Sequence, residues 1–79
     1  MPASSVFSPA APQTFSGAAL KRLRTSQNRT RPQLAADARI TVDHLKFLET
    51  GLGLPSVGCL TRLAAALGVP VGDLFEAAR

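Results

Sequence analysis

The stretch TRPQLAADARITVDHLKFLETG, residues 30–51, decides the fold. Its first half opens with two signals for the start of a helix. Thr30 and Gln33 have the spacing of a capping box, in which each side chain accepts a hydrogen bond from a backbone N–H. Pro32 lies in the first turn, where the N–H that proline lacks would have no partner within the helix. These signals predict a short helix over residues 31–38.

The second half of this stretch predicts another helix, over about residues 42–50. Thr41 is a suitable N-cap, and Asp43 in the first turn complements the partial positive charge of a helix N-terminus. Leu45 and Leu48 have the spacing of one buried helix face. Two short helices joined by so tight a turn are typical of a helix-turn-helix, whose second helix enters the major groove of DNA.

Helical spacing of apolar residues continues on both sides of this motif and predicts an all-α domain. We expect a bundle of five short helices, which cover residues 16–27, 31–38, 42–50, 56–67 and 71–78. The fourth carries the clearest amphipathic repeat in the chain. Gly68 is expected to end it in the left-handed conformation, and Pro70 prevents its continuation.

The first part of the chain has a different composition. Residues 1–15 contain three prolines and no charged side chain, so we expect a disordered arm, with residues 16–79 forming the single domain. No apolar run approaches the ~20 residues needed to cross a bilayer. The single Cys59 cannot form an internal disulfide. These features predict a cytoplasmic protein without a membrane partner.

Positive charge is concentrated in the middle of the chain. The formal net charge is +4, and seven of the nine lysines and arginines fall within residues 21–46, against only two aspartates. A basic half on a small domain is typical of a protein that binds a polyanion. On charge alone, the alternative that these side chains form the solvated surface of arginine-rich helices stays open.

The sequence resembles the Cro/lambda-repressor-like, or Xre, family of helix-turn-helix domains over residues 15–75. The resemblance rests on LKRLRTSQNRTRPQLAADARITVDHLKFLETG followed by LPSVGCLTRLAAALGVPVGDLF, which follow the family pattern without a gap. One departure is Arg39, which stands where the turn of this family usually carries glycine. A left-handed conformation there costs a non-glycine residue ~1–2 kcal/mol. We therefore expect either a reshaped turn or an Arg39 that is tolerated because it reaches a phosphate.

The resemblance also implies roles for individual residues. Arg24 and Glu49 match the family's structural ion pair between the first and third helices. The positions that match DNA-contacting residues of the family are Arg31, Val42, Asp43, His44 and Phe47. We assign the last four of these to base reading. Phosphate contacts are assigned to the basic residues around the helix-turn-helix: Arg29, Arg31, Arg39 and Lys46.

The base-reading assignments have alternatives. Asp43 either accepts a hydrogen bond from cytosine N4 or only complements the helix N-terminus. Phe47 either contacts a thymine methyl group or packs against the neighbouring loop. Val42 is assigned to a thymine methyl group, with half-burial against the turn as its alternative. His44 is a donor to a base or to a phosphate.

These features predict a sequence-specific transcriptional regulator that binds double-stranded DNA as a homodimer on a palindromic operator. The last helix and the 52–55 loop are the expected dimer surfaces. The resemblance implies a repressor of its own operon, of the phage-repressor, controller or antitoxin type, and an antitoxin would also bind a toxin protein.

The alternative function is a protein-interaction module of the same fold that does not read DNA, which Asp43 and Phe47 on the recognition face favour. The sequence contains no nucleophile–base set, metal-ligand cluster or phosphate-binding glycine loop. We therefore expect no enzymatic activity, no cofactor and no metal.

Overall fold

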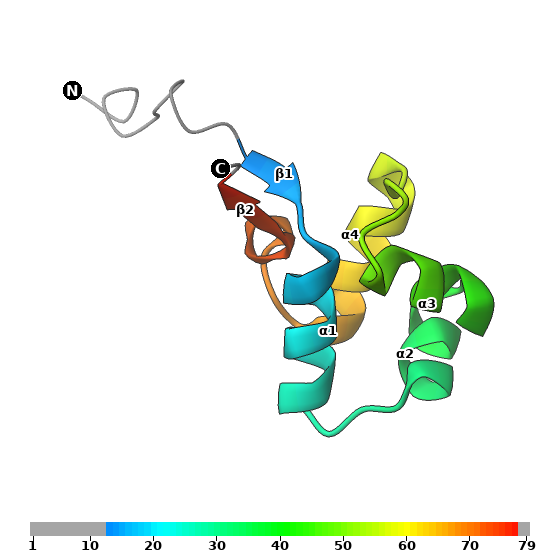
Figure 1. The fold of residues 1–79 in the computed structure, drawn as a ribbon. Coiled ribbons are helices and arrows are strands. Elements are labelled where there is room, and N and C mark those ends of the chain that lie inside the picture. Colours follow the sequence, from blue (N-terminus) through cyan, green and yellow to red (C-terminus); the bar gives the residue numbers. More distant parts are fainter. Residues whose placement is uncertain (1–12, 78–79) are drawn as a thin grey trace.

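The computed structural model describes residues 13–77, which form four α-helices, one 3-10 turn and a two-stranded sheet (Figure 1). In chain order the elements are β1 (Gln13–Phe15), α1 (Gly17–Ser26), α2 (Arg31–Ala38), α3 (Val42–Glu49), α4 (Val57–Leu67), η2 (Val71–Leu74) and β2 (Phe75–Ala77). The predicted helix-turn-helix is present as α2 and α3, with three residues between them. Across the described range, no helix is long and apolar enough to span a lipid bilayer.

Serine and threonine N-caps fix where the α-helices begin. In each α-helix the cap oxygen accepts a hydrogen bond from the backbone N–H three residues later, and the four caps are Ser16, Thr30, Thr41 and Ser56. The N–H of Thr30 also donates to Oε1 of Gln33 at 2.9 Å, which completes the predicted capping box. Because each cap contributes about 1 kcal/mol, these residues set the helix starts and so the length of the turn between α2 and α3.

The predicted fifth helix over residues 71–78 is wrong. Val71–Leu74 forms a 3-10 turn only, and Phe75–Ala77 forms strand β2. This strand pairs antiparallel with β1, with Phe75 opposite Phe15. The apolar spacing of this segment fits a helix, but pairing with a distant strand satisfies its backbone instead. The fold is therefore mostly helical, with four α-helices and a small two-stranded sheet in place of the predicted fifth helix.

The same sheet corrects the expected boundary of the arm. Residues 13–15, which we expected in the arm, belong to the fold as β1. The connection to α1 is also fixed, because the N–H of Ser16 donates to the carbonyl oxygen of Leu74 at 2.8 Å. Residues 1–12 of the expected arm lie outside the described residues.

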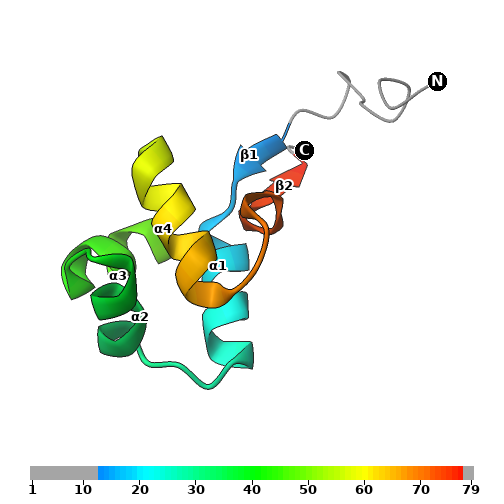
Figure 2. The ribbon, with the colours of Figure 1, turned by 180° about the vertical axis from the view of Figure 1, so that it is seen from behind.

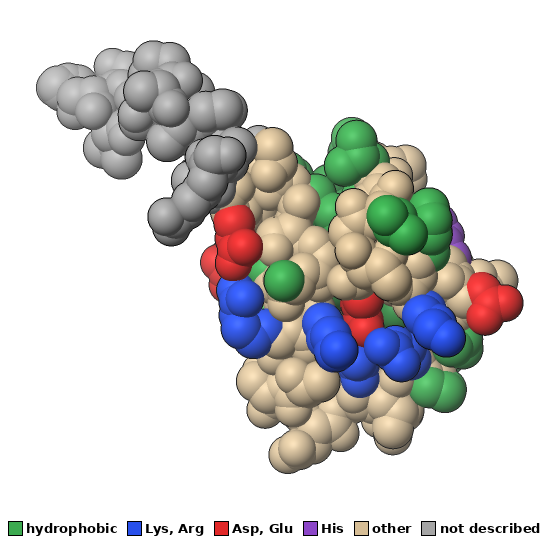
Figure 3. All heavy atoms as spheres, viewed as in Figure 1, with side chains coloured by type: hydrophobic (Ala, Val, Ile, Leu, Met, Phe, Trp, Pro, Cys, Tyr) green, Lys and Arg blue, Asp and Glu red, His purple; other side chains and the backbone are tan. Residues whose placement is uncertain are grey.

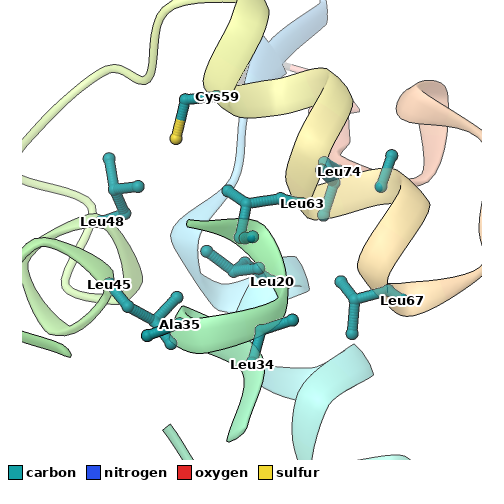
Figure 4. Close-up of a cluster of buried hydrophobic side chains, with 11 residues drawn as sticks. Leu20, Leu34, Ala35, Leu45, Leu48, Cys59, Leu63, Leu67 and Leu74 are labelled. Carbon is teal, nitrogen blue, oxygen red and sulfur yellow. The ribbon is translucent and has the colours of Figure 1, made fainter. Parts of the chain in front are cut away.

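One leucine-rich core holds the elements together (Figure 4). Its largest fully buried side chains are Leu20, Leu34, Leu45, Leu48, Leu63 and Leu74. The alanines Ala35 and Ala38 on α2 are also buried, and their small size permits α3 and α4 to approach closely. Figures 1 and 2 show α2 and α3 at one end of the molecule and the sheet at the opposite end. The core thus fixes α3 against α2 with one side of α3 turned outward.

Candidate nucleic-acid interface

The turn between α2 and α3 depends on a left-handed residue that is not glycine. Arg39 has φ 60° and ψ 43° and forms the C-cap of α2. Its N–H donates to the carbonyl of Ala36 at 3.2 Å, and the N–H of Ile40 donates to that of Ala35 at 3.0 Å. Of the two expected outcomes, the turn keeps the left-handed conformation and is not reshaped. The Arg39 side chain is exposed beside the start of α3.

Replacing Arg39 by glycine is expected to raise the free energy of unfolding by about 0.5–1 kcal/mol. Relief of ~1–2 kcal/mol of left-handed strain exceeds the added entropy of the unfolded chain, ~0.4–1 kcal/mol. The control Arg39→Ala also removes the charge but keeps the strain. Urea unfolding of both variants checks the expectation, and a glycine variant no more stable than the alanine variant contradicts it.

The outward side of α3 carries the predicted base-reading residues. All four are exposed: Val42, Asp43, His44 and Phe47. Leu45 and Leu48 are buried on the opposite side, which leaves this arc of the helix free of contacts with the core. Among residues 13–77, the side chains of Asp43 and His44 have no hydrogen-bond or ion-pair partner. Donors and acceptors on this surface are therefore available to an external ligand.

Phe47 lies partly against the neighbouring loop. A Cβ atom at residue 53 would overlap Cε2 of the Phe47 ring, so the ring can keep this position only beside glycine. One side of the ring thus packs on the backbone of Gly53, as one of the two alternatives for Phe47 expects. The residue is nevertheless 47% exposed, and the rest of the ring extends the outward surface of α3.

Arg29 is used within the monomer. Its Nη1 donates to the carbonyl oxygen of Ala66, and its Nη2 pairs with the carboxylate of Asp37. These contacts hold the connection between α1 and α2 against the last turns of α4 and α2. A phosphate would have to displace these contacts, so we do not propose Arg29 as a phosphate-binding residue.

The other predicted phosphate-binding residues remain accessible. Arg39 and Lys46 are exposed, and neither side chain has a hydrogen-bond or ion-pair partner within the described range. Arg31, at the start of α2, is half-buried. Figure 3 shows basic side chains gathered in a row across the face seen in Figure 1, with an acidic side chain among them. This row supplies positive charge beside the end of the molecule that carries α2 and α3.

Glu49 at the end of α3 contacts two arginines from other elements. The residue that the family resemblance pairs with it, Arg24, lies in contact: Nε is 2.6 Å from Oε2, and Nη2 is 3.2 Å from Oε1. Arg31 approaches the same carboxylate, with Nε 3.0 Å from Oε1. The first contact joins α1 to α3, and the second joins α2 to α3. All three elements around the candidate interface are thereby linked through one carboxylate.

Two further polar side chains bind carbonyl groups at helix ends, and neither was predicted from the sequence. Nε of Arg62 on α4 donates to the carbonyl of Ala38, the last residue of α2, at 2.8 Å. Nε2 of Gln27 donates to the carbonyl of Leu67, the last residue of α4, at 2.8 Å. Each satisfies a carbonyl that lacks a partner inside its helix. Only the tertiary structure brings these residues together, so no local signal indicates them.

An apolar patch lies beside the candidate interface, on the connection from α3 to α4. It consists of Leu52, Leu54 and Val57, which are 76%, 82% and 80% exposed. Next to it is a surface groove of about 300 Å³, whose lining comprises Thr14, Phe15, Leu54, Pro55, Leu60 and Phe75. Figure 3 shows hydrophobic side chains projecting over this region. The exposed side chains of the apolar patch therefore project from the surface next to the groove, and Leu54 belongs to both.

The described residues offer no metal centre or reactive thiol. No three His, Cys, Asp or Glu side chains in residues 13–77 lie close enough to hold a metal ion. Cys59 is buried in the core, and this burial raises the pKa of its thiol, an effect that the nearby positive charge of Arg62 partly opposes. Its role is packing.

Comparisons with known proteins agree with this geometry. A family model described as a helix-turn-helix domain matches residues 17–78. The chain is similar to the restriction-modification controller protein C.AhdI from Aeromonas hydrophila, with 27% identity, coverage of 75% of this chain and 89% of that one, and a TM-score of 0.72. It is also similar to the clp gene regulator ClgR from C. glutamicum, with 34% identity, coverage of 73% and 75%, and a TM-score of 0.69. The sequence has no significant match among curated proteins.

Proposed function

Because this chain belongs to the helix-turn-helix domain family, we propose that it is a transcriptional regulator that binds double-stranded DNA through α3. The observation that carries the proposal is the placement of α3, which is braced by α2 and the core on one side and exposed on the other. An exposed helix of this kind fits the major groove. Two proteins of similar structure are described as a controller protein and a gene regulator, which supports the same function.

Within this function we assign base reading to Val42, Asp43, His44 and Phe47, and phosphate contact to Arg31, Arg39 and Lys46. The first group lies on the exposed arc of α3, and the second surrounds that arc with positive charge. Phosphate contacts fix the register of a protein on the duplex, whereas base contacts carry the sequence information. The two groups are therefore expected to differ in how their substitution affects binding.

We also propose that the regulator acts as a homodimer on a palindromic operator and represses its own operon, as a controller-type protein. One α3 contacts only a few base pairs, so two copies are needed to specify a site. A two-fold interface requires the same patch on both copies to be self-complementary. The apolar patch and its adjoining groove support this proposal, because together they offer a projecting apolar surface and a hollow that a second copy could fill. The segment of residues 50–61 also carries no charged side chain, which lets two basic chains approach there.

A salt titration tests DNA binding. If a dimer neutralises ~6–8 phosphates, log K for a duplex should fall with log salt concentration at a slope of about −5 to −7. Fluorescence anisotropy with a labelled duplex of mixed sequence measures this slope. No binding at low salt, or affinity independent of salt, would contradict the proposal and favour the protein-interaction module.

Base reading is tested separately with DNA from upstream of the chain's own gene. Val42→Ala and His44→Ala are expected to change the preference between that DNA and mixed-sequence duplex, since each alters contacts to base edges. Ala65→Ser, at an exposed position of α4, is the control and should keep the parent's preference. If the Val42 and His44 variants kept the parent's preference, the proposal that α3 reads the bases would be contradicted.

A further inference from the structure

Glu49 holds two arginines that have different surroundings. Its side chain is only 2% exposed, and Arg24 reaches both of its oxygens from α1. Nη1 of Arg24 also donates to the carbonyl of Arg29 at 2.9 Å, so each of its three guanidinium nitrogens donates a hydrogen bond inside the molecule. The pair of Arg24 and Glu49 is therefore complete without a third member, and the second arginine needs another explanation.

Arg31 uses only one edge of its guanidinium in this contact. Nε lies 3.0 Å from Oε1 of Glu49, whereas Nη1 and Nη2 make no hydrogen bond to any other described residue. Its side chain is 35% exposed, so the free edge faces solvent at the start of α2. Two adjacent N–H groups on such an edge match two oxygens of a phosphate. Arg24 and Arg31 carry two positive charges and Glu49 one negative charge, so the three side chains together have a net positive charge.

We propose that Glu49 is a positioning residue for DNA binding, which holds Arg31 by Nε so that both Nη groups face one backbone phosphate. This inference rests on the proposed function. An arginine that is oriented before binding loses less side-chain freedom when it meets the phosphate. Glu49 is the last residue of α3, and Arg31 is the first residue of α2. The carboxylate therefore links the phosphate contact directly to the element that faces the bases, and helps to set the register between them.

A double-mutant cycle on duplex binding tests the coupling. Four proteins are compared: the parent, Arg31→Ala, Glu49→Gln and the double variant, each titrated with a mixed-sequence duplex at fixed salt. Arg31→Ala is expected to weaken binding about tenfold in the parent and less than about threefold in the Glu49→Gln background, because the unpositioned arginine contributes little. Equal losses in both backgrounds would overturn the proposal.

Arg22→Ala is the matched control for the cycle. Arg22 pairs with Glu76 at 2.7 Å on an exposed part of the surface, so its loss removes one positive charge without contact to Glu49. Its effect on binding should be the same in the parent and in the Glu49→Gln background. If the parent itself does not bind the duplex, the proposed function fails, which is a different result from equal losses in a chain that does bind.

A second variant keeps the test decisive if Glu49→Gln does not fold. Arg31→Lys leaves Glu49 unchanged and retains the charge, but a lysine ammonium has no planar fork, so it cannot present two parallel N–H groups to one phosphate while Glu49 holds it. We expect Arg31→Lys to weaken binding at least fivefold while the salt slope stays at the parent value. Arg31→Ala should instead reduce the slope by about 0.9 for each protomer. A lysine variant that binds as tightly as the parent would overturn the proposal.

Discussion

An Arg24→Ala variant is expected to lose about 3 kcal/mol of unfolding free energy. Removing one partner of a buried ion pair costs ~3–5 kcal/mol because the other charge stays buried without compensation. Glu49 keeps Arg31 as a partner in this variant, which places the loss at the lower end of the range. A domain of this size has a total stability of about 4–12 kcal/mol, so the variant would approach the limit of folding.

Urea unfolding followed by circular dichroism measures this loss, with an unchanged m-value as the sign that the folded state is otherwise intact. Arg22→Ala is the control, because it removes an arginine from an exposed ion pair with Glu76. Such a pair contributes ~0–1 kcal/mol. Similar losses in the two variants would mean that burial of the Glu49 carboxylate has no energetic consequence, contrary to the expectation.

A Leu54→Glu variant is expected to be monomeric and to bind a two-half-site operator at least ~100-fold more weakly than the parent. Leu54 belongs both to the apolar patch and to the lining of the groove, so a carboxylate there would be buried without a partner in the proposed dimer. A monomer also loses the gain in affinity that comes from joining two binding modules, which reaches ~10²–10⁴. Because the side chain is 82% exposed, the fold of the monomer should not change.

Sedimentation velocity gives the oligomeric state of this variant, and anisotropy gives its affinity. The matched control is Ala65→Glu, which adds the same charge at an exposed α4 position outside the apolar patch. The salt slope of Leu54→Glu should fall to about half the parent value, because one protomer makes half the phosphate contacts. If the variant stayed dimeric, the dimer interface would have to lie outside the apolar patch, contrary to the proposal.

The helix-turn-helix was predictable because its signals are local. Thr30 and Gln33 specify a helix start within four residues, and Thr41 does the same for α3. The spacing of Leu45 and Leu48 then determines which side of α3 is outward. Each of these features depends on residues within two turns of one another, so the sequence alone carries them.

The last element was not predictable in the same way. The apolar residues from Val71 onward fit the period of a helix, but Phe75 pairs with Phe15, which lies at the other end of the domain. The energy of that pairing depends on the whole chain being folded. Local spacing therefore favoured the wrong structure.

In the candidate site, too, the features set by nearby residues were predictable and those set by distant contacts were not. Exposure of the proposed base-reading residues on α3 followed from the helix pattern. The partners of Arg29, by contrast, include Ala66 on α4, and the second arginine on Glu49 comes from α2. Whether a surface arginine is free or held is decided by such distant contacts, which neither charge nor spacing indicates.

The register of the small sheet has a consequence for engineering the domain. Gln13 and Ala77 are direct partners across β1 and β2, so the chain enters and leaves the fold at one corner. In a variant that begins at Gln13 and ends at Ala77, a short peptide linker could join these two residues into a closed ring while their pairing is kept. Cyclisation would remove extended conformations from the unfolded ensemble and slow fraying of the sheet. Because this corner lies opposite α2 and α3, the closed ring would leave the proposed DNA-binding surface untouched.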